Sequence, residues 1–515
     1  MKLEHSTYQK PLSLTGFGGG ATSLNFAGVS GAPAGFVLTL NDTSTHERAH
    51  DIRIGSDGSI YGCGQTNASG CGDTAFIFKA DASGNVEWQR YLCNNGAYYG
   101  MTLDSSDNVI VTARSSGVYA GNVVKYNSSG VLQWQKKLTE SNHYVTPNDV
   151  GVDSSDNIYI TGYLMLTSGG IGTYRPLVAK YNSSGVLQWF RVYKGTLYGT
   201  ELSGYYGTYN MDCYGGTVDS SGNVYITGRI TAQSYSGAYA AKINSSGTWQ
   251  WTTFLKHGSQ NPGSGIGFGI DTDSSGNVYI SGYGTSPAQS GNQGTDAFVA
   301  KFNSTGTYQW INFFGSTIQN DEAQGVVVDS SGNIFVTGVV NNGGQYLRAL
   351  SITKFKSSPT GSGYAIYNNN TQIEYKRVIR NFSPYDSGSY YVYGQGITLD
   401  SDENVYVAGY TNKSTQNWGN SDNEIVIGKI PNDGTLTGTY SFGSSDWIYM
   451  DGANIYNSYY LDTSAPSHTT QNGGNYVGNT NIVFVDTSSS YTMTEANATF
   501  TDATTSMTSA ITLFE

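Results

Sequence analysis

The residues best suited to metal chemistry are His46, Glu47 and His50, which form a His-Glu-x-x-His motif. On a helix this spacing places two zinc ligands one turn apart, with a general base between them. Here a predicted β-strand starts at Asp51, directly after the motif, so the long helix of a zinc peptidase is not expected. No third ligand follows at a recognisable spacing. We therefore expect no metal at this motif.

A second candidate is the acidic stretch from Asp271 to Asn277, which resembles the start of a calcium-binding loop. Such loops carry Glu at their twelfth position, and that position is Gly282 in this chain. A hairpin turn accounts for Asp273 to Asn277 without any ion, because Asp caps backbone amides and Gly or Asn accepts a left-handed conformation. Calcium binding remains the weaker alternative.

Catalytic constellations are not recognisable in the chain. The six histidines are scattered, and none lies in a Ser-His-Asp context. The segment NSSGTWQW, which starts at Asn244, lacks the Asp of the Ser-x-Asp-x-Gly-x-Thr-Trp box of sialidases. No pair of carboxylates suggests glycoside hydrolysis. We expect a non-enzymatic protein with no catalytic residues, no cofactor and no metal.

Composition narrows the class of protein. Of the 515 residues only 12% are charged, and the chain holds 67 Gly and 41 Tyr, a profile that favours an extracellular or particle-borne β-protein. A net charge of -12 argues against binding nucleic acid, which requires a basic surface. No run of about 18 apolar residues occurs, and residues 1–20 contain no apolar core of a signal peptide, so neither membrane insertion nor export by that route is expected.

Four cysteines are too few for a disulfide framework in a chain of this length. Cys63 and Cys71 flank one loop and could pair, but free thiols are favoured for all four: Cys63, Cys71, Cys93 and Cys213.

The elements that must position any site come from a repeat. The stretch DSSGNVYITG, Asp219 to Gly228, recurs from Asp104, Asp153, Asp273, Asp329 and Asp400, with a degenerate copy at Gly55. Residues 97–138 divide into four short strands joined by Ser-Ser-Asp and Ser-Ser-Gly turns, and four strands per unit of 40 to 50 residues is typical of a β-propeller blade. Seven copies predict an all-β, seven-bladed propeller.

Each repeat also carries an aromatic residue at one register after its third strand. We interpret these residues as packing anchors between neighbouring blades, since an aromatic side chain buries about 150 to 250 Å². They are Trp88, Trp134, Trp189, Trp251, Trp310, Tyr375 and Tyr440. The repeated turn acids are likewise interpreted as scaffold.

The ends of the chain lack the repeat. We predict an N-terminal arm at 1–35 for attachment, a propeller at 36–442 and a C-terminal β/coil extension at 443–515 that docks on a partner or on the propeller. The segment Phe36 to Leu40 resembles a third strand of the later repeats and could complete a neighbouring blade. The insertion Ser357 to Thr371 lies on the short-turn face and suggests contact with a neighbouring subunit.

The repeat resembles the SBBP family of β-propeller repeats, on the residues DSSGNVYITG and AFVAKFNSTGTYQW. The resemblance covers about residues 47–442. Runs of such repeats resemble structural proteins of marine tailed bacteriophages, including cyanophages, and they also occur in bacterial surface proteins. The resemblance implies a virion protein that is present in many copies or as an oligomer and contacts other virion proteins through both extensions.

One face of the expected propeller carries the variable links between strands, and such loops are where binding residues concentrate. The links are Tyr193 to Cys213, Tyr283 to Asp296, Lys376 to Tyr393, and Tyr410 to Asp422. Two of them are dense in Tyr, Ser and Gly, as in antibody paratopes. The candidate recognition residues are Tyr198, Tyr205, Tyr206, Tyr209, Tyr214, Tyr385, Tyr390, Tyr391 and Tyr393. Alternatively, Tyr is the general surface aromatic of this chain.

These observations predict a tail or fibre-type virion appendage that displays the variable face to a host-surface glycan or protein. A purely structural capsid decoration or tail ring is the alternative. A bacterial surface adhesin or a polysaccharide hydrolase is the third possibility.

Overall fold

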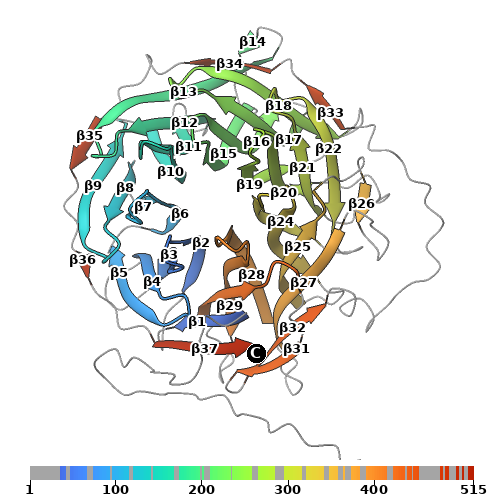
Figure 1. Ribbon diagram of the computed structural model, residues 1–515. Coiled ribbons are helices and arrows are strands. Elements are labelled where there is room, and N and C mark those ends of the chain that lie inside the picture. The colour runs from blue at the N-terminus through green and yellow to red at the C-terminus, as the bar shows by residue number, and fades with distance from the viewer. Residues whose placement is uncertain are drawn as a thin grey trace, which may run out of the picture.

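In the computed structural model the described part of the chain is built of β-strands arranged in a ring (Figure 1). The structure describes residues 35–41, 47–66, 74–92, 96–114, 120–140, 143–166, 173–197, 200–201, 209–232, 235–257, 265–284, 295–315, 320–341, 347–357, 363–365, 373–382, 390–413, 422–434, 438–442, 445–451, 476–479, 482–486, 494–497, 502–503 and 508–514. Within these ranges no helix is long and apolar enough to cross a membrane.

The first five repeats each fold into four antiparallel strands. Their strands are β2 (Arg48–Ile54), β3 (Ile60–Thr66), β4 (Thr74–Ala80) and β5 (Val86–Leu92); β6 (Tyr98–Leu103), β7 (Val109–Arg114), β8 (Ala120–Tyr126) and β9 (Leu132–Thr139); β10 (His143–Val152), β11 (Ile158–Leu166), β12 (Thr173–Tyr181) and β13 (Leu187–Leu197); β15 (Tyr209–Val218), β16 (Val224–Ala232), β17 (Tyr235–Ile243) and β18 (Trp249–His257); and β19 (Ile266–Thr272), β20 (Val278–Gly284), β21 (Asp296–Phe302) and β22 (Tyr308–Phe314). The predicted four-stranded blade is confirmed.

The sixth and seventh repeats do not form separate blades. Their strands are β23 (Glu322–Val328), β24 (Ile334–Asn341), β25 (Leu347–Phe355) and β27 (Ile373–Phe382), followed by β28 (Tyr390–Leu399), β29 (Val405–Lys413) and β30 (Asp422–Ile430). All of them belong to one eleven-stranded sheet, because β25 and β28 pair in parallel at Leu347 with Tyr390 and at Arg348 with Tyr391. Both strands start at the same face of the ring and therefore run in the same direction.

The predicted count of seven blades is therefore wrong. Among the described strands, five sheets each hold one repeat, and the last two repeats share the sixth sheet. The remaining strands are β1 (Gly35–Asn41), β14 (Thr200–Glu201), β26 (Gly363–Ala365), β31 (Gly438–Phe442), β32 (Ser445–Asp451), β33 (Tyr476–Asn479), β34 (Ile482–Asp486), β35 (Thr494–Asn497), β36 (Asp502–Ala503) and β37 (Thr508–Phe514).

The repeated turns follow the predicted chemistry. Asp219 Oδ1 accepts hydrogen bonds from the backbone amides of Ser221 at 3.0 Å and Asn223 at 2.9 Å. Gly222 lies in the left-handed region with φ of 77°, where a residue without Cβ is not strained. The acid of the motif thus holds a hairpin, and its interpretation as scaffold is confirmed.

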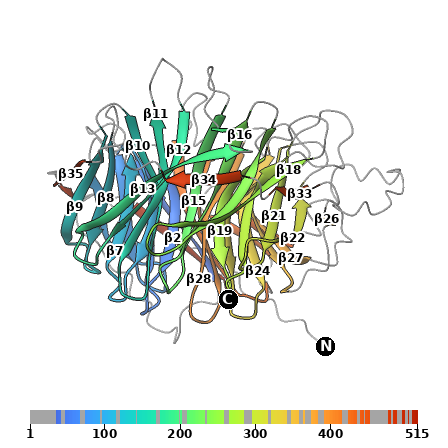
Figure 2. The ribbon, with the colours of Figure 1, turned by 90° about the horizontal axis from the view of Figure 1, so that it is seen from above.

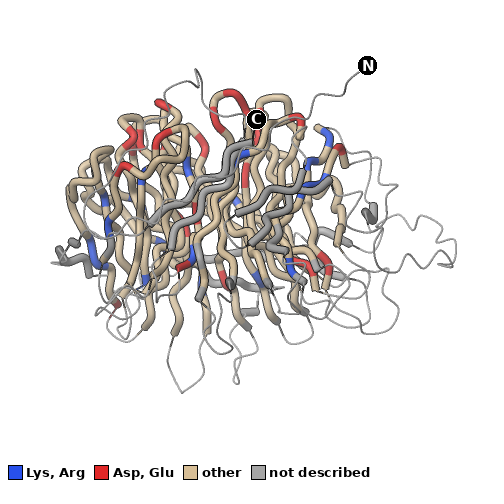
Figure 3. Tube along the Cα trace, turned by 90° about the horizontal axis from the view of Figure 1, so that it is seen from below, with Lys and Arg blue, Asp and Glu red and all other residues tan. Residues whose placement is uncertain are grey.

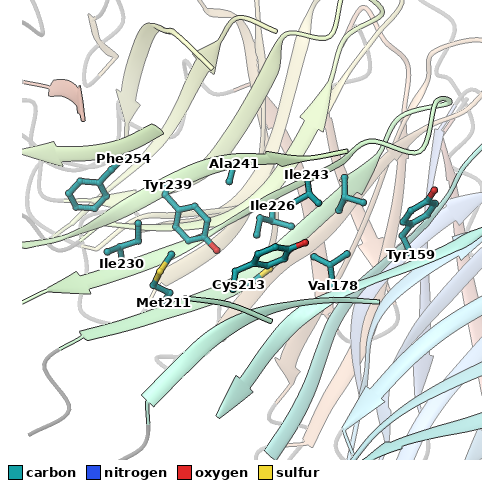
Figure 4. Close-up of a cluster of buried hydrophobic side chains, with 12 residues drawn as sticks. Tyr159, Val178, Met211, Cys213, Ile226, Ile230, Tyr239, Ala241, Ile243 and Phe254 are labelled. Atoms are coloured by element: carbon teal, nitrogen blue, oxygen red, sulfur yellow. The ribbon is translucent and has the colours of Figure 1, made fainter. Parts of the chain in front are cut away.

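The core lies between successive repeats. Figure 4 shows one cluster, in which Tyr159 and Val178 of the third repeat meet Cys213, Ile226 and Tyr239 of the fourth. Because each sheet packs on a neighbour at both faces, apolar side chains alternate with aromatic ones rather than with polar ones. Another cluster joins Ala49 and Ile52 of the first repeat to Tyr406 and Ile425 of the seventh, which completes the ring.

The aromatic anchors behave as predicted where they are described. The Trp88 indole donates a hydrogen bond to the Ser128 carbonyl of the next repeat at 3.1 Å. Its ring covers Gly130, where a Cβ would lie 2.7 Å from Trp88 Cδ2. Tyr375 covers Gly434 in the same way. Tyr440 does not take the predicted position, because it lies on β31, which pairs with β32, whereas the strand that pairs with β30 is β1. Its side chain lies outside the described residues.

The two ends of the chain contribute outer strands. β1 is antiparallel to β30, with Phe36 opposite Lys429 and Leu40 opposite Ile425, so the segment does complete the seventh repeat. β37 then covers the other edge of β1. The ring is therefore closed by strands from distant parts of the chain.

The described C-terminal strands run along the outer edges of the sheets (Figure 1). β32 pairs with β27, β33 with β18, β34 with β13, β35 with β9 and β36 with β5. Unpaired sheet edges invite association with other chains, and these strands cover them within one chain. The 363–365 portion of the predicted insertion also stays within the chain, because β26 pairs with β22.

Candidate recognition surface

The ring has two unlike faces (Figure 2). First strands end, and second strands begin, at the short repeated turns, which we call the short-turn face. First strands begin and second strands end at the opposite, variable face. The contacts described below belong to the variable-face halves of these strands.

The structure describes some of the predicted recognition residues. Tyr214 lies on β15, and Tyr391 and Tyr393 lie on β28, with all three side chains partly exposed. Tyr209 and Tyr390 start those two strands, and their side chains lie outside the described residues. Tyr198, Tyr205, Tyr206 and Tyr385 also lie outside them.

Tyr391 and Tyr393 belong to a group that joins the sixth and seventh repeats. The Tyr393 ring stacks on Tyr410, with centroids 4.8 Å apart and planes 16° apart. The Arg348 guanidinium donates a hydrogen bond to the Tyr393 hydroxyl at 2.8 Å. It also lies 5.7 Å from the Tyr391 ring centroid and 5.6 Å from that of Tyr393, within the range of a cation–π interaction.

The contacts continue into the first and second repeats. Arg48 lies over the Tyr410 ring at 4.9 Å. His50 contacts Tyr99, with ring centroids 5.1 Å apart. Arg114 lies 4.5 Å from the centroid of the same Tyr99 ring. Guanidinium groups and rings thus alternate across the junctions between repeats.

Tyr163 and Tyr214 extend the pattern through the third, fourth and fifth repeats. Tyr163 lies 5.8 Å from Arg114 and makes an edge contact with Tyr174 at 5.2 Å. Tyr214 contacts Phe268 at 5.6 Å, and Phe268 contacts Tyr283 at 5.7 Å.

We call this set the aromatic–arginine layer. Every member is partly exposed. Its members are Arg48, His50, Tyr99, Arg114, Tyr163, Tyr174, Tyr214, Arg229, Phe268, Tyr283, Arg348, Tyr391, Tyr393 and Tyr410.

Two local features of the repeat build this layer. The first is the residue directly after the ten-residue motif, which is Arg114, Tyr163, Arg229, Tyr283 or Tyr410 in five of the repeats. The second is a β-bulge in the first strand, which leaves a residue such as His50, Tyr214 or Phe268 outside the regular pairing. A bulge re-aims its side chain. The position after the motif could have been recognised in the sequence. The predicted recognition residues were instead chosen from loops dense in tyrosine.

Charges in the layer are unevenly compensated. Arg229 is paired with Asp212 at 2.8 Å. Burial raises the pKa of Asp212, although Arg229 opposes that rise. Burial and the Asp212 carboxylate raise the pKa of Tyr214, so its hydroxyl stays protonated. Burial, with the Arg48 and Arg114 charges, lowers the pKa of His50 to about 4, so its imidazole is neutral at pH 7.

The acidic residues of the repeated turns gather at the short-turn face (Figure 3), whereas the arginines of the aromatic–arginine layer lie on the variable-face halves of the strands. A further set of acids lies on the inner strands. Asp51 accepts from the Met101 amide at 2.9 Å, Asp149 from Gly216 at 3.1 Å and Asp271 from Val328 at 2.9 Å. Each bond crosses from one repeat to the next, so these carboxylates link inner strands.

Glu47 and Asp273, from the two motifs that suggested metals, have structural roles, and His46 lies outside the described residues. Glu47 is buried and accepts a hydrogen bond from Thr66 at 3.2 Å, while His50 lies on β2, not on a helix. Asp273 Oδ1 caps Ser275 and Asn277 as a hairpin turn requires. Across the described ranges no group of three or more His, Cys, Asp or Glu residues could hold a metal ion.

Cys63 and Cys213 are buried free thiols; Cys71 and Cys93 lie outside the described residues.

Comparison with known proteins supports the repeat type. Residues 133–163 and 382–414 match the SBBP beta-propeller repeat family. These segments are SBBP-type propeller repeats. They span the junction of the second and third repeats and the beginning of the seventh.

A curated viral relative is an uncharacterized WD repeat-containing protein of Acanthamoeba polyphaga mimivirus. It is 28% identical, and the match covers 25% of this chain and 12% of the relative. The chain thus spans about an eighth of that protein's length.

Similar solved structures include the polysaccharide lyase Uly1, at 9% identity and a TM-score of 0.42, covering 80% of this chain and 94% of that one. Another is a protein of unknown function from Dyadobacter fermentans, at 10% identity and a TM-score of 0.37, covering 77% and 98%.

Proposed function

We propose that this chain is a non-enzymatic recognition protein of a virion, and that its aromatic–arginine layer binds glycans on a host surface. The layer itself carries the proposal. It gathers partly exposed rings and guanidinium groups from every repeat at one face. Aromatic rings offer apolar area with a polar edge, which suits a sugar that has C–H faces and hydroxyl edges.

The virion assignment rests on sequence resemblance. The repeats resemble those of tailed-phage structural proteins, and the curated relative described above is viral. Display of many copies on a particle would raise avidity without strong affinity at any one site. Contacts with other virion proteins through the terminal extensions are part of the proposal.

A panel of immobilised surface polysaccharides from susceptible and resistant host cells tests the binding role. We expect the purified chain to bind polysaccharides of susceptible cells. Tyr214→Ala and Tyr391→Ala should each weaken binding about tenfold if the rings are energetic centres of the contact. Val131→Ser and Val186→Ser are matched controls, since both valines are 55% exposed in short turns.

The proposal fails if no polysaccharide or susceptible cell is bound, or if the tyrosine variants bind as tightly as the controls. Release of shortened saccharides by the purified chain would instead identify a hydrolase or lyase. Labelling the chain within intact particles separates an exposed appendage from a capsid decoration or tail ring.

A further inference from the structure

Three arginines of the aromatic–arginine layer lack an acidic partner. Arg48, Arg114 and Arg348 stack on tyrosine rings, and none forms an ion pair with a carboxylate of the described residues. Arg229 and Arg53, by contrast, are each paired with an Asp. In a chain of net charge -12, unpaired guanidinium groups on one face are conspicuous.

Two of these arginines flank one imidazole. Both Arg48 and Arg114 act electrostatically on His50, and Arg114 shares the Tyr99 ring with it. On the far side, Arg114 Nη2 donates to the Asn148 side chain at 2.9 Å. The centre thus combines two positive charges, a neutral imidazole and the rings of Tyr99 and Tyr410.

Unsatisfied polar atoms point to a missing ligand at this centre. His50 Nε2 and Arg114 Nε are both buried and have no hydrogen-bond partner among the described residues. A buried polar atom without a partner costs about 1 to 3 kcal/mol, so such atoms require an explanation. Both atoms belong to side chains that contact the Tyr99 ring, so they lie in one neighbourhood of the structure.

We propose that Arg48, His50 and Arg114 form a subsite for the anionic group of an acidic saccharide, a carboxylate or a sulfate. This inference rests on the proposed glycan-binding function and names its ligand class. Guanidinium groups suit such oxyanions because their planar fork matches two oxygens. The Tyr410 ring contacts Arg48 and stacks on Tyr393, and the Tyr99 ring contacts Arg114 and His50, so these rings hold the groups of the subsite in place. The choice of a saccharide over an acidic peptide follows from the proposed function.

Calorimetric titration with defined probes tests the subsite. The probes are tetragalacturonate, its fully methyl-esterified form and a sulfated galactose tetrasaccharide. We expect the two anionic probes to bind and the uncharged ester to bind at least about tenfold more weakly, as the loss of one charged hydrogen bond implies. Whichever anion binds more tightly identifies the natural group as carboxylate or sulfate.

Arg48→Gln with Arg114→Gln should weaken anionic binding about a hundredfold, since two charge-assisted bonds are lost. Arg191→Gln is the matched control, because Arg191 stacks on Trp189 of the outer strand β13. Unchanged thermal melting of the double variant excludes misfolding. If the double variant melts early, the single variant Arg48→Gln supplies the comparison and should weaken anionic binding about tenfold, since one charge-assisted bond is lost.

The inference is overturned if ester and acid bind equally, if the arginine variants bind tetragalacturonate as the wild type does, or if tetraglutamate competes better than the saccharide. If the chain binds neutral host glycans but neither anionic probe, the subsite is overturned and the proposed function is still supported. Anion binding without any binding to host cells would support the subsite and contradict the proposed function.

Discussion

The Ser105 hydroxyl donates a hydrogen bond of 2.6 Å to Asp156 Oδ2, and this bond joins the turn of the second repeat to the turn of the third. The Ser105 amide reaches Oδ1 of the same carboxylate at 2.9 Å. Asp156 has φ of 57°, at the turn position where four other repeats carry Gly and two others carry Asp107 and Glu403. The replacement of Gly by Asp in DSSDN therefore adds a bond between repeats, at the cost of placing a residue with Cβ in the left-handed region.

Substitution of Asp156 separates these two effects. Asp156→Ala should lower the free energy of unfolding by about 2 kcal/mol, because it loses a charge-assisted bond and leaves a residue poorly suited to this φ. Asp156→Gly should be nearly neutral, since relief of the backbone offsets the lost bond. Urea denaturation measures both. Equal destabilisation by Ala and Gly would contradict this account.

Asp271 should make stability depend on pH. Burial raises its pKa to about 6, although amide hydrogen bonds from Val328 and Thr272 oppose the rise. The pKa of Asp271 is higher in the folded chain than its ordinary value. The contribution of this carboxyl to the free energy of unfolding is therefore fully present below about pH 4, and it is lost as pH rises through 6 and the buried group ionises. The free energy of unfolding of Asp271→Asn should therefore rise by about 3 kcal/mol relative to that of wild type between pH 4 and pH 8.

Asp273 provides the control of opposite sign. Hydrogen bonds from Asn277, Tyr279 and Ser275 lower its pKa despite burial. Its contribution is therefore present above its ordinary pKa and is lost as pH falls. The free energy of unfolding of Asp273→Asn should therefore fall relative to that of wild type as pH rises from 2 to 5. Denaturant midpoints at each pH measure both variants, and parallel profiles would refute the assignment for Asp271.

Gly130 should be intolerant of any side chain. At φ of 74° an added Cβ would be strained and would lie 2.7 Å from the Trp88 ring. We expect Gly130→Ala to cost about 2 to 4 kcal/mol, the sum of backbone strain and overpacking. Gly58→Ala has a similar φ of 81°, but its nearest neighbour is Ala82 Cβ at 3.4 Å, so it should cost about 1 to 2 kcal/mol. Thermal melting that ranks the two variants equally would argue against the Trp88 contact.

Removal of residues 445–515 should promote self-association. The deletion uncovers the outer edges of β5, β9, β13, β18 and β27, and uncovered edges pair with other chains. Light scattering after gel filtration should show larger species than for the full chain, with β-rich circular dichroism retained. A truncated chain as monodisperse as the full chain would mean that the outer strands do not protect these edges.

Much of this architecture could be predicted from local sequence. The hairpin at Asp219 depends on residues within five positions of one another, and Trp88 meets Gly130 because each repeat places a ring and a turn at constant spacing. Interactions that act over a few residues, or that recur with the same motif in each repeat, leave a readable pattern.

The tertiary structure decided what depends on contacts between distant segments. The pairing of β1 with β30 and β37, and of the C-terminal strands with five sheets, joins parts of the chain that share no motif. The merging of the last two repeats followed from one short parallel contact. The aromatic–arginine layer likewise required the ring to close, because Arg48 and Tyr410 meet only where the first repeat packs on the seventh. Loop tyrosines could be counted along the chain, but which rings share a guanidinium depends on how neighbouring repeats face each other in space.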